Sequence, residues 1–344
     1  MNNVGQAIAA MNEYGSKAIP FLFIIDFEGE RPLVYRIDEL EGKDIFFDID
    51  GHGNGASPGS PPPALYFESR PVPFPRYRDA FEEVQQYLRR GDTYLLNLTF
   101  PSEVNLNYSL RQVFDHSRAR YRLYYRDQFV VFSPETFVQI REGRIAGFPM
   151  KGTISAELPD AAQRVLADEK EFAEHCTIVD LIRNDLSIIA TEVEVERFRY
   201  IDRVETQGGA LLQVSSEITG RVPVDYRARI GELLFRLLPA GSVSGAPKRR
   251  TLEIIRAAEG APRGYYTGVF GCFDGRNLDS AVMIRYLERN GDQFYYRSGG
   301  GITALSGLEE EYEELIKKIY VPLTGNDPDR ERTPAAPGLS HAAS

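Results

Sequence analysis

The chain has 344 residues, of which 42% are hydrophobic and 11% aromatic, a composition typical of a globular protein with a sizeable core. Its net charge of −10 argues against a general nucleic-acid binder, whose affinity comes from a basic surface. No segment reaches the roughly 18 consecutive apolar residues of a membrane span, and no basic stretch followed by an apolar one marks a secretory signal. We therefore expect a cytoplasmic protein that binds neither nucleic acid nor membrane.

The first half of the chain alternates apolar runs with turn residues. Strands are expected at 21–27 and 34–37, and the Gly/Pro/Ser-rich stretch 51–63 is expected to be a loop. Apolar residues at helical spacing predict an amphipathic helix over 77–90, and a strand over 94–100 follows. Further short strands are expected at 121–125, 129–132, 137–140 and 193–198.

The second half contains longer elements. A helix is expected over 164–186. Residues 280–287 are predicted to be a strand, joined to a second at 293–297 by an Asn-Gly turn, which is typical of a hairpin. A helix is expected over 308–320, and the polar, proline-rich tail 324–344 is expected to be disordered. Strands mixed with a few long helices, without regular βαβ alternation, predict an α+β fold with mostly antiparallel sheets.

Two predicted helices carry glutamates three residues apart. These are Glu171 and Glu174 in KEFAEH and Glu311 and Glu314 in EEEYEE, and each pair projects from one side of its helix. For either pair alone, a solvated charged face is the ordinary interpretation. If the two pairs faced each other, their carboxylates would form an oxygen-rich site suited to Mg²⁺.

Two glycine-rich stretches are candidates for anion binding. The first, 241–248, contains Ser242 but lacks the GK[ST] ending of a nucleotide-binding loop. The second contains Gly299, Gly300 and Gly301. Both stretches have backbone N–H groups to offer a carboxylate. Arg285, inside a predicted apolar strand, is either a clamp for the same anion or an edge-strand or ion-pair arginine.

Lys151 lies in FPMKGT, where proline and glycine constrain the backbone. A lysine in a partly desolvated turn loses its proton more readily and can act as a nucleophile, although most isolated lysines are solvated surface residues. Glu135, in SPE, is a candidate general acid if its surroundings raise its pKa. The chain shows no Ser/His/Asp triad and no glutaminase nucleophile, so ammonia from glutamine would have to come from another chain.

Taken in order, these segments resemble the chorismate-utilising enzymes. The resemblance covers about residues 80–320. The matching stretches are SPE (133–135), PMKGT (149–153), KEFAEHCTIVDLIRNDL (170–186), PAGSVSGAPKRRTLEII (239–255), RGYYTGVFG (263–271), AVMIR (281–285), SGGGI (298–302) and EEYEE (310–314).

The resemblance implies one catalytic domain over 1–323, with a short N-terminal portion at 1–79. Its fold would be two packed antiparallel β-sheets flanked by helices, with the active site between the sheets. Mg²⁺ would be held by Glu174 and Glu314, with Glu171 and Glu311 close by, and would bind the ring carboxylate of chorismate.

The resemblance also assigns the remaining residues. Glu135 would assist the departure of the ring hydroxyl. The residues implied to bind the substrate, most of them at its enolpyruvyl carboxylate, are Arg285, Tyr266, Ser242 and the backbone of Gly299, Gly300 and Gly301.

Two positions bear on the branch of the family. Lys151 resembles the lysine of the aminodeoxychorismate synthase component I enzymes, which attacks the chorismate ring before ammonia adds, in the route to 4-aminobenzoate and folate. The water-activating lysine of the isochorismate and salicylate enzymes is replaced by Leu95, and Asn97 also resembles the aminating branch. A glutamine amidotransferase subunit is the implied partner.

Two alternatives remain open. The first is an anthranilate synthase component I, which the sequence LLQVSSE (211–217) disfavours because it replaces a histidine-containing stretch of those enzymes. The second is a non-catalytic chorismate-binding subunit, which would have no need for Glu135, Lys151, Glu174 and Glu314 together.

Overall fold

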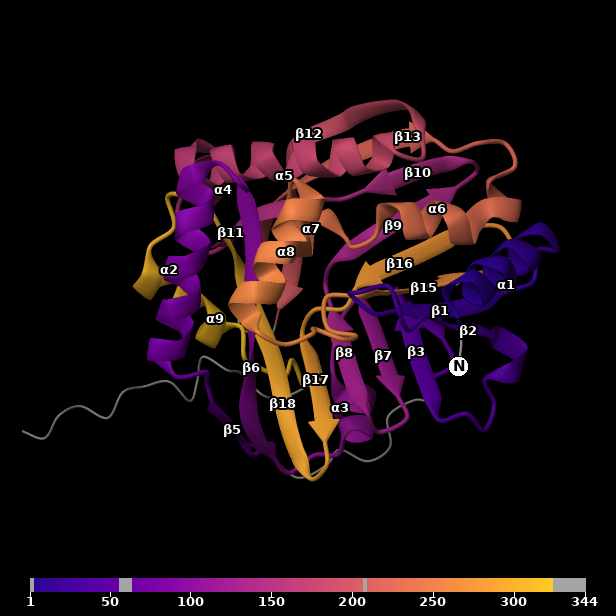
Figure 1. The fold of residues 1–344 in the computed structure, drawn as a ribbon, viewed down its shortest axis with the longest axis horizontal. Coiled ribbons are helices and arrows are strands. Elements are labelled where there is room, and N and C mark those ends of the chain that lie inside the picture. The colour runs from indigo at the N-terminus through magenta and orange to yellow at the C-terminus, as the bar shows by residue number, and fades with distance from the viewer. Residues whose placement is uncertain (1–2, 56–63, 207–208, 324–344) are drawn as a thin grey trace, which may run out of the picture.

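The structure is a computed structural model that describes residues 3–55, 64–206 and 209–323. In these residues the strands form two antiparallel sheets (Figure 1). The first sheet has the order β11 (Met150–Ser155), β13 (Gly209–Arg221), β10 (Arg144–Gly147), β9 (Thr136–Arg141), β16 (Leu278–Val282), β15 (Val269–Phe273), β1 (Phe21–Ile25) and β2 (Leu33–Arg36), and β12 (Thr191–Thr206) pairs with β13. The second sheet has the order β14 (Gly245–Ala246), β6 (Leu95–Leu106), β18 (Gln293–Ile302), β17 (Tyr286–Asn290), β8 (Phe129–Ser133), β7 (Tyr121–Tyr125), β3 (Ile45–Ile49) and β4 (His52–Gly53), and β5 (Phe67–Arg70) pairs with β6.

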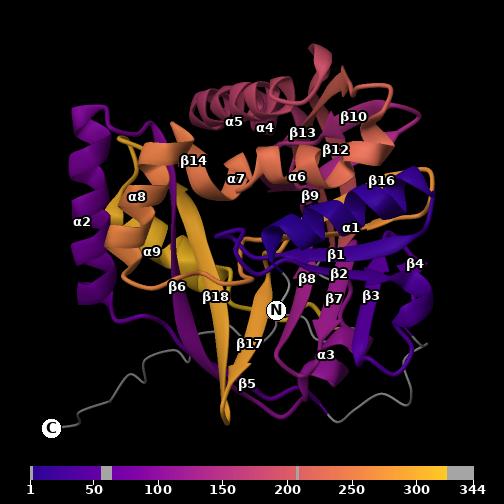
Figure 2. The same ribbon diagram turned by 45° about the vertical axis from the view of Figure 1, so that its right-hand side comes forward.

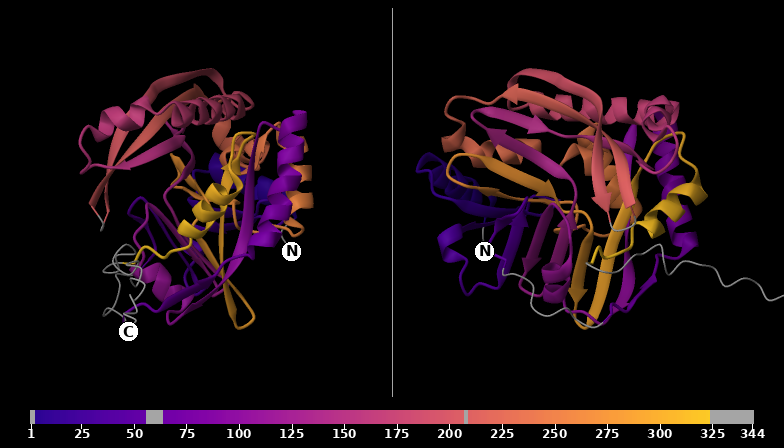
Figure 3. Two further views of the ribbon diagram at one scale, coloured as in Figure 1. Left: turned by 90° about the vertical axis from the view of Figure 1, so that its left-hand side faces the viewer. Right: turned by 180° about the vertical axis from the view of Figure 1, so that it is seen from behind.

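Helices cover the outer faces of both sheets. The first sheet is covered by α1 (Val4–Ser16), α5 (Glu169–Ser187) and α6 (Ile230–Leu237). The second is covered by α2 (Phe74–Arg90), α3 (Leu110–His116), α8 (Lys248–Glu259) and α9 (Leu308–Lys317). Figure 2 shows α2 and α8 side by side next to β6, and in Figure 3 the yellow α9 lies beside the second sheet. The predicted α+β fold of two packed antiparallel sheets flanked by helices is confirmed.

The apolar run at the first strand shows how the layers are held together. All five residues of β1 are buried. Phe21 and Phe23 face the helices of the first sheet, whereas Leu22 and Ile24 pack between the sheets against strands of the second. A strand buried on both faces reads as a continuous apolar run rather than as an alternating one, and this explains the sequence FLFII.

The predicted strand 280–287 is wrong, because the chain changes sheets within it. β16 ends at Val282 in the first sheet and β17 begins at Tyr286 in the second. Arg285, just before β17, has a φ of 53°, in the left-handed region. The break therefore places Arg285 at a junction between the sheets rather than inside a strand. The Asn290–Gly291 hairpin of β17 and β18 is confirmed.

The predicted helix 164–186 is two helices. α4 (Ala161–Ala167) and α5 meet at Asp168, which has an extended backbone and accepts a hydrogen bond from the backbone N–H of Glu171 at 2.9 Å. Aspartate is a preferred residue at the start of a helix because its carboxylate satisfies a free N–H group there. The predicted C-terminal helix ends at Lys317 rather than at 320.

Other differences are smaller. Helix α1 was not predicted, although Asn3 caps it with its side chain. The strand predicted at 293–297 continues through the glycines to Ile302. Within the predicted loop 51–63, His52 and Gly53 form β4, and residues 56–63 lie outside the described residues, as does the tail 324–344. The assignment of 1–323 to one domain stays a prediction. Among the described residues, no helix is long and apolar enough to cross a membrane.

Candidate active site

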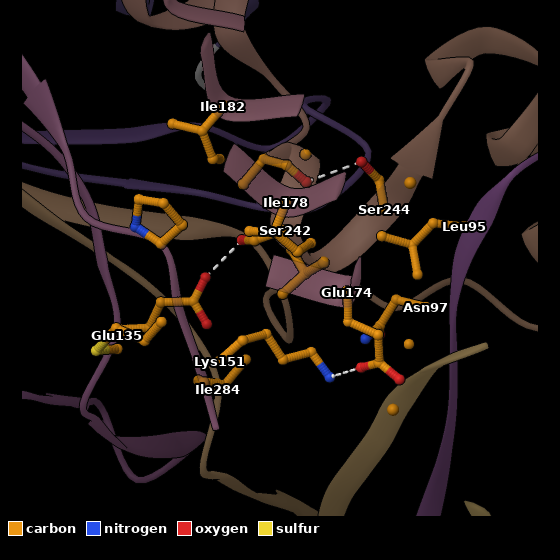
Figure 4. Close-up of a pocket in the computed structure, with 18 of the residues that line it drawn as sticks. Leu95, Asn97, Glu135, Lys151, Glu174, Ile178, Ile182, Ser242, Ser244 and Ile284 are labelled. Carbon is orange, nitrogen blue, oxygen red and sulfur yellow. Dashed lines mark hydrogen bonds and ion pairs between the residues drawn. The ribbon is translucent and has the colours of Figure 1, made fainter. Parts of the chain in front are cut away.

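A cavity of about 680 Å³ lies where the two sheets meet, between α5 and α9. Its walls come from β6, β11, β18, α5, α7 (Gly241–Ser244) and the two junctions between the sheets. The predicted site residues that line it are Glu135, Lys151, Glu171, Glu174, Ser242, Tyr266, Arg285, Gly299, Gly300, Gly301 and Glu314. Residues predicted from segments far apart in the chain therefore share one cavity, several of which are drawn in Figure 4.

Glu135 and Arg285 lie at adjacent crossings between the sheets. Glu135 is in the link from β8 to β9, and Arg285 is in the link from β16 to β17. Backbone hydrogen bonds join each link to a strand that leads into the other link. Val282 N–H, at the end of β16, donates to the Glu135 carbonyl at 3.1 Å, and Phe132 N–H, in β8, donates to the Arg285 carbonyl at 3.1 Å. The sheet junction thus fixes both side chains at the cavity.

The carboxyl group of Glu135 is held by Ser242. The Ser242 hydroxyl donates to Glu135 Oε1 at 2.5 Å, as Figure 4 shows. Burial raises the pKa of Glu135 above its ordinary value, and it outweighs the Ser242 hydrogen bond, which lowers this pKa. A carboxyl group with a raised pKa carries a proton at higher pH, as a general acid must. The direction of this shift is the one that a general acid requires, and the role of Glu135 stays a prediction.

Lys151 projects from a bulge in the edge strand β11. The pairing with β13 shifts between Met150 and Thr153, and Gly152 has a φ of 87°, which favours glycine. Lys151 Nζ lies 2.5 Å from Glu174 Oε2 (Figure 4). Burial acts to lower the pKa of Lys151, but Glu174, together with Glu171 and Glu314, outweighs burial and raises this pKa above the ordinary value. The lysine therefore keeps its proton in this ion pair, contrary to the expectation from desolvation alone.

The two glutamates of α5 differ in their partners. Glu174 pairs with Lys151, whereas Glu171 Oε2 is buried without a hydrogen-bond partner. Burial raises the pKa of Glu171, and the carboxylate of Glu174 raises it further. Glu171 is thus a buried oxygen donor still available to a ligand.

The two glutamates of α9 also differ in their partners, which are Lys318 for Glu314 and Ser306 for Glu311. Glu314 Oε1 lies 2.6 Å from Lys318 Nζ. Burial acts to raise the pKa of Glu314, but Lys318 outweighs it and holds this pKa below the ordinary value. Burial raises the pKa of Glu311, which is not among the lining residues; its Oε2 would lie 3.2 Å from a Cβ built on Gly300. Lys318 was not predicted; its position four residues after Glu314 is the signal that was available.

The glycines of β18 belong to a strand rather than to a loop. The edge of this strand presents their backbone groups to the cavity. β17 pairs with β18 only as far as Arg297, so residues 298–302 pair with β6 alone. Opposite Gly299, the Thr99 N–H donates to Glu259, and opposite Gly301, the Asn97 carbonyl accepts from Arg263. These two positions are therefore not bonded across the ladder, and the polar groups of Gly299 and Gly301 face away from β6. The Gly299 carbonyl accepts from Lys318 Nζ at 2.9 Å.

Arg285 and Tyr266 complete the predicted anion-binding wall. The Arg285 guanidinium lies over the ring of Tyr320, 5.1 Å from its centre. Tyr266 is 4% exposed, and burial raises its pKa to about 12, so its hydroxyl stays a hydrogen-bond donor at neutral pH. Leu95 and Asn97 also line the cavity. A cation beside a phenol and a free strand edge suits a carboxylate.

The four glutamates lie around the region in which Mg²⁺ was predicted. Lys151 acts electrostatically on all four carboxylates, so they surround one region. Among the described residues, no three His, Cys, Asp or Glu side chains lie close enough to hold a metal as they stand. However, Glu171 Oε2 is a buried carboxylate oxygen without a hydrogen-bond partner, so it can serve as a metal ligand. Gly300 has no side chain, so the space that a Cβ would fill beside Glu311 and Glu314 stays open. An all-carboxylate donor set with this open space fits a hard divalent cation.

Solved structures and sequence relatives define the class of protein. The menaquinone-specific isochorismate synthase MenF from Escherichia coli has the same fold, with a TM-score of 0.71 and 15% identity over 92% of this chain and 81% of that one. Residues 48–324 match the family described as chorismate binding enzyme. The chain belongs to this family.

Some relatives match this chain over nearly their whole length, and others match it over about half of theirs. An uncharacterized PabA-like protein from Haemophilus influenzae is 50% identical over 93% of this chain and 97% of its own length. The aminodeoxychorismate synthase component 1 of Bacillus subtilis is 31% identical over 71% of this chain and 54% of its own. The anthranilate synthase component 1 of Aquifex aeolicus is 33% identical over 70% and 51%. The chain spans about half the length of the last two relatives, and overall identity does not separate them.

Proposed function

We propose that the chain is the chorismate-binding component of an aminodeoxychorismate synthase. It converts chorismate and ammonia to 4-amino-4-deoxychorismate, the precursor of 4-aminobenzoate in folate synthesis. The observation that carries this proposal is the placement of Lys151 Nζ in the cavity, 2.5 Å from Glu174, with Leu95 on the wall where a water-activating base would stand in the hydrating enzymes. A leucine cannot take a proton from water, so amination through Lys151 is favoured over hydration.

The residues of the chain divide the reaction between them. Arg285, Tyr266 and the free edge of Gly299–Gly301 bind the enolpyruvyl carboxylate and orient the ring. Lys151 leaves its ion pair with Glu174, passes one proton to solvent and attacks ring carbon C2 as a free amine. Glu135, protonated because burial raises its pKa, donates its proton to the departing C4 hydroxyl group, which leaves as water. Ammonia then adds at C4, the ring double bonds shift back, and the bond from C2 to the Lys151 nitrogen breaks. The new ammonium group at C4 returns a proton to Glu135, and the released Lys151 amine takes up a proton from solvent.

Mg²⁺ belongs to the proposal as a resident cofactor. Glu174 and Glu314 would hold it, with Glu171 and Glu311 close by, and it would supply positive charge for the ring carboxylate of chorismate. The unpartnered oxygen of Glu171 supports this assignment. Lys151 and Lys318 provide the positive charge at Glu174 and Glu314 in the structure described here.

A glutamine amidotransferase subunit is the proposed source of ammonia. The sequence offers no glutaminase nucleophile, and an amination at C4 requires an ammonia donor. Purified chain should therefore use an ammonium salt alone, and should use glutamine only after the second subunit is added.

The product formed from chorismate, Mg²⁺ and an ammonium salt tests the proposal. We expect a product that gives 4-aminobenzoate only after a separate lyase is added, as chromatography and mass spectrometry would show. Fluorescent anthranilate formed without a lyase would instead identify an anthranilate synthase component. Chorismate that is bound but recovered unchanged would identify a non-catalytic binding subunit.

A further inference from the structure

Strand β6 has a gap on the edge that faces away from β18. On that edge β14 pairs with Leu95 and Leu96, and β5 pairs with residues 103–106. Along residues 97–102 the described strands leave this edge without a neighbour. Buried backbone groups need a hydrogen-bond partner, so something other than a strand must satisfy this stretch.

A buried ion pair fills the gap. Glu259, the last residue of α8, accepts hydrogen bonds from the N–H and the hydroxyl of Thr99 at 2.9 and 3.0 Å. Arg263 donates to the Asn97 carbonyl at 2.6 Å. The Arg263 guanidinium donates two hydrogen bonds to the Glu259 carboxylate, from Nη2 to Oε1 at 2.6 Å and from Nε to Oε2 at 2.9 Å. The Arg263 side chain is 1% exposed and the Glu259 side chain 6%. Figure 2 shows α8 lying beside β6.

The ion pair binds the two positions of β6 that lie opposite glycines of β18. Asn97 lies opposite Gly301, and Thr99 lies opposite Gly299. Because the polar groups of Asn97 and Thr99 turn toward the ion pair, those of the two glycines turn to the cavity. A change in this pair would therefore be transmitted across one strand to the edge proposed to hold the enolpyruvyl carboxylate.

Arg263 also ties down two other parts of the cavity wall. Its Nη1 donates to the Val243 carbonyl at 2.7 Å, next to the Ser242 that holds Glu135, and to the Thr267 hydroxyl at 3.3 Å, next to Tyr266. The ring of Phe27 lies under the guanidinium, 4.5 Å away. One planar donor thus joins β6, α7 and the segment before β15 in a geometry that the point charge of a lysine does not reproduce.

We propose that Glu259 and Arg263 are positioning residues for chorismate, which hold the carboxylate-binding edge of β18, Ser242 and Tyr266 in register without touching the substrate. The inference rests on chorismate binding in this cavity, as in the proposed function. A buried ion pair is often no more stabilising than an apolar replacement. Its role here is the alignment of the wall rather than the stability of the fold.

The test compares two variants of the pair with a matched arginine elsewhere. Arg263→Lys keeps the charge and removes the fork, and Glu259→Gln keeps an oxygen for Thr99 but ends the ion pair. The control is Arg122→Lys in β7. Arg122 also bonds a carboxylate, that of Asp48, and donates to two carbonyls at 3.1 and 3.0 Å, but it lies outside the cavity wall.

Chorismate affinity is measured by calorimetric titration of the full chain with Mg²⁺, below the melting temperature of each variant. We expect the Kd of Arg263→Lys to rise about 10- to 100-fold, with an upper end on the order of the loss that a displacement of about 1 Å causes in the rate of an enzyme. The Kd of Glu259→Gln should rise in the same direction. Arg122→Lys should lower the melting temperature and leave the Kd unchanged. In turnover, KM should rise more than kcat falls.

Two results would overturn the inference. One is wild-type affinity in both Arg263→Lys and Glu259→Gln, and the other is an equal loss of affinity in Arg122→Lys. If Arg263→Lys does not fold, Glu259→Gln alone decides between the outcomes. The readout is binding, so formation of anthranilate by the wild-type chain would refute the proposed function and leave this comparison intact.

Discussion

The two glutamate pairs of the cavity are built alike but held differently. In each pair one carboxylate meets a lysine, Glu174 with Lys151 and Glu314 with Lys318, at 2.5 and 2.6 Å. In each pair the other carboxylate has a pKa raised by burial. Each pair also lies against a glycine, Gly152 beside α5 and Gly300 beside α9.

The difference lies in the lysines. Lys318 is on the same helix as Glu314 and also donates to the Gly299 carbonyl at 2.9 Å, so two interactions fix its ammonium group. Lys151 comes from another element, the bulge of β11, and the described residues provide no hydrogen-bond acceptor for it besides Glu174. Lys318 is therefore a fixed part of the cavity wall, whereas Lys151 has to break only its interaction with Glu174 before it reaches a substrate.

The largest expected effect follows from replacing each lysine in turn. Lys151→Ala should lower amination of chorismate on the order of 10³-fold, because the nucleophile is lost, while chorismate binding stays largely intact. Lys318→Ala should lower amination about 10-fold through the lost hydrogen bond to Gly299. Mass spectrometry of chain trapped with chorismate should find an adduct on Lys151 in wild type and in Lys318→Ala. Equal losses in the two variants, or full activity in Lys151→Ala, would break the comparison.

The metal dependence of the two pairs gives the next effect. A Cβ on Gly300 would lie 3.2 Å from Glu311, which is tight, and in ordinary contact with Glu314 at 3.6 Å, so Gly300→Ala should displace the Glu311 carboxylate. We expect the Mg²⁺ concentration for half-maximal activity to rise about 10-fold. The control is Gly301→Ala, whose Cβ would meet only Leu95, at 3.2 Å, and whose Mg²⁺ dependence should match wild type. An unchanged Mg²⁺ dependence in Gly300→Ala would argue against the α9 pair as metal ligands.

Much of this site was visible in the sequence because its residues lie in ordered motifs. The spacing of three residues placed Glu171 and Glu174 on one side of a helix, and the apolar runs gave most of the strands. Residues whose role depends on tertiary pairing were harder to place. Arg285 was assigned to a strand because SAVMIRYL is apolar throughout, and nothing in that run marks the φ of 53° at which the chain changes sheets.

The electrostatics of Lys151 and the role of Arg263 could not be predicted for the same reason. The PMKGT motif shows the constrained turn, but Glu174 is 23 residues further along, and only the packing of α5 on β11 brings the two side chains together. Arg263 stands in an ordinary PRGYY turn. Its importance follows from a gap between β14 and β5 that exists only once the sheet has formed.

A smaller effect separates backbone strain from displacement of the α5 pair. Gly152 and Gly91 have φ values of 87° and 78°, so alanine at either position should cost about 1–2 kcal/mol of folding free energy. A Cβ at Gly91 meets nothing within 4 Å, whereas one at Gly152 lies 3.3 Å from Val165 and 3.6 Å from Glu171 Oε2. Denaturant titrations should show a loss in both variants, and a larger one in Gly152→Ala because of the tight contact with Val165. Only Gly152→Ala should also change the Mg²⁺ dependence; a change in both would mean that strain alone is responsible.

The smallest expected effect is a shift in the alkaline limb of the kcat profile, which we assign to Glu135. As a general acid it works when protonated, so kcat should fall as pH rises through its pKa, which burial raises. Lys318 is one of the cations that lower this pKa. Lys318→Met removes that charge, which favours the protonated acid. The alkaline limb of the kcat profile should therefore move to higher pH, by about half a unit. Glu135→Gln, which has no proton to lose, should lack this limb and lower kcat about 10²-fold or more. A limb that moves to lower pH in Lys318→Met, or persists in Glu135→Gln, would assign the acid to another group.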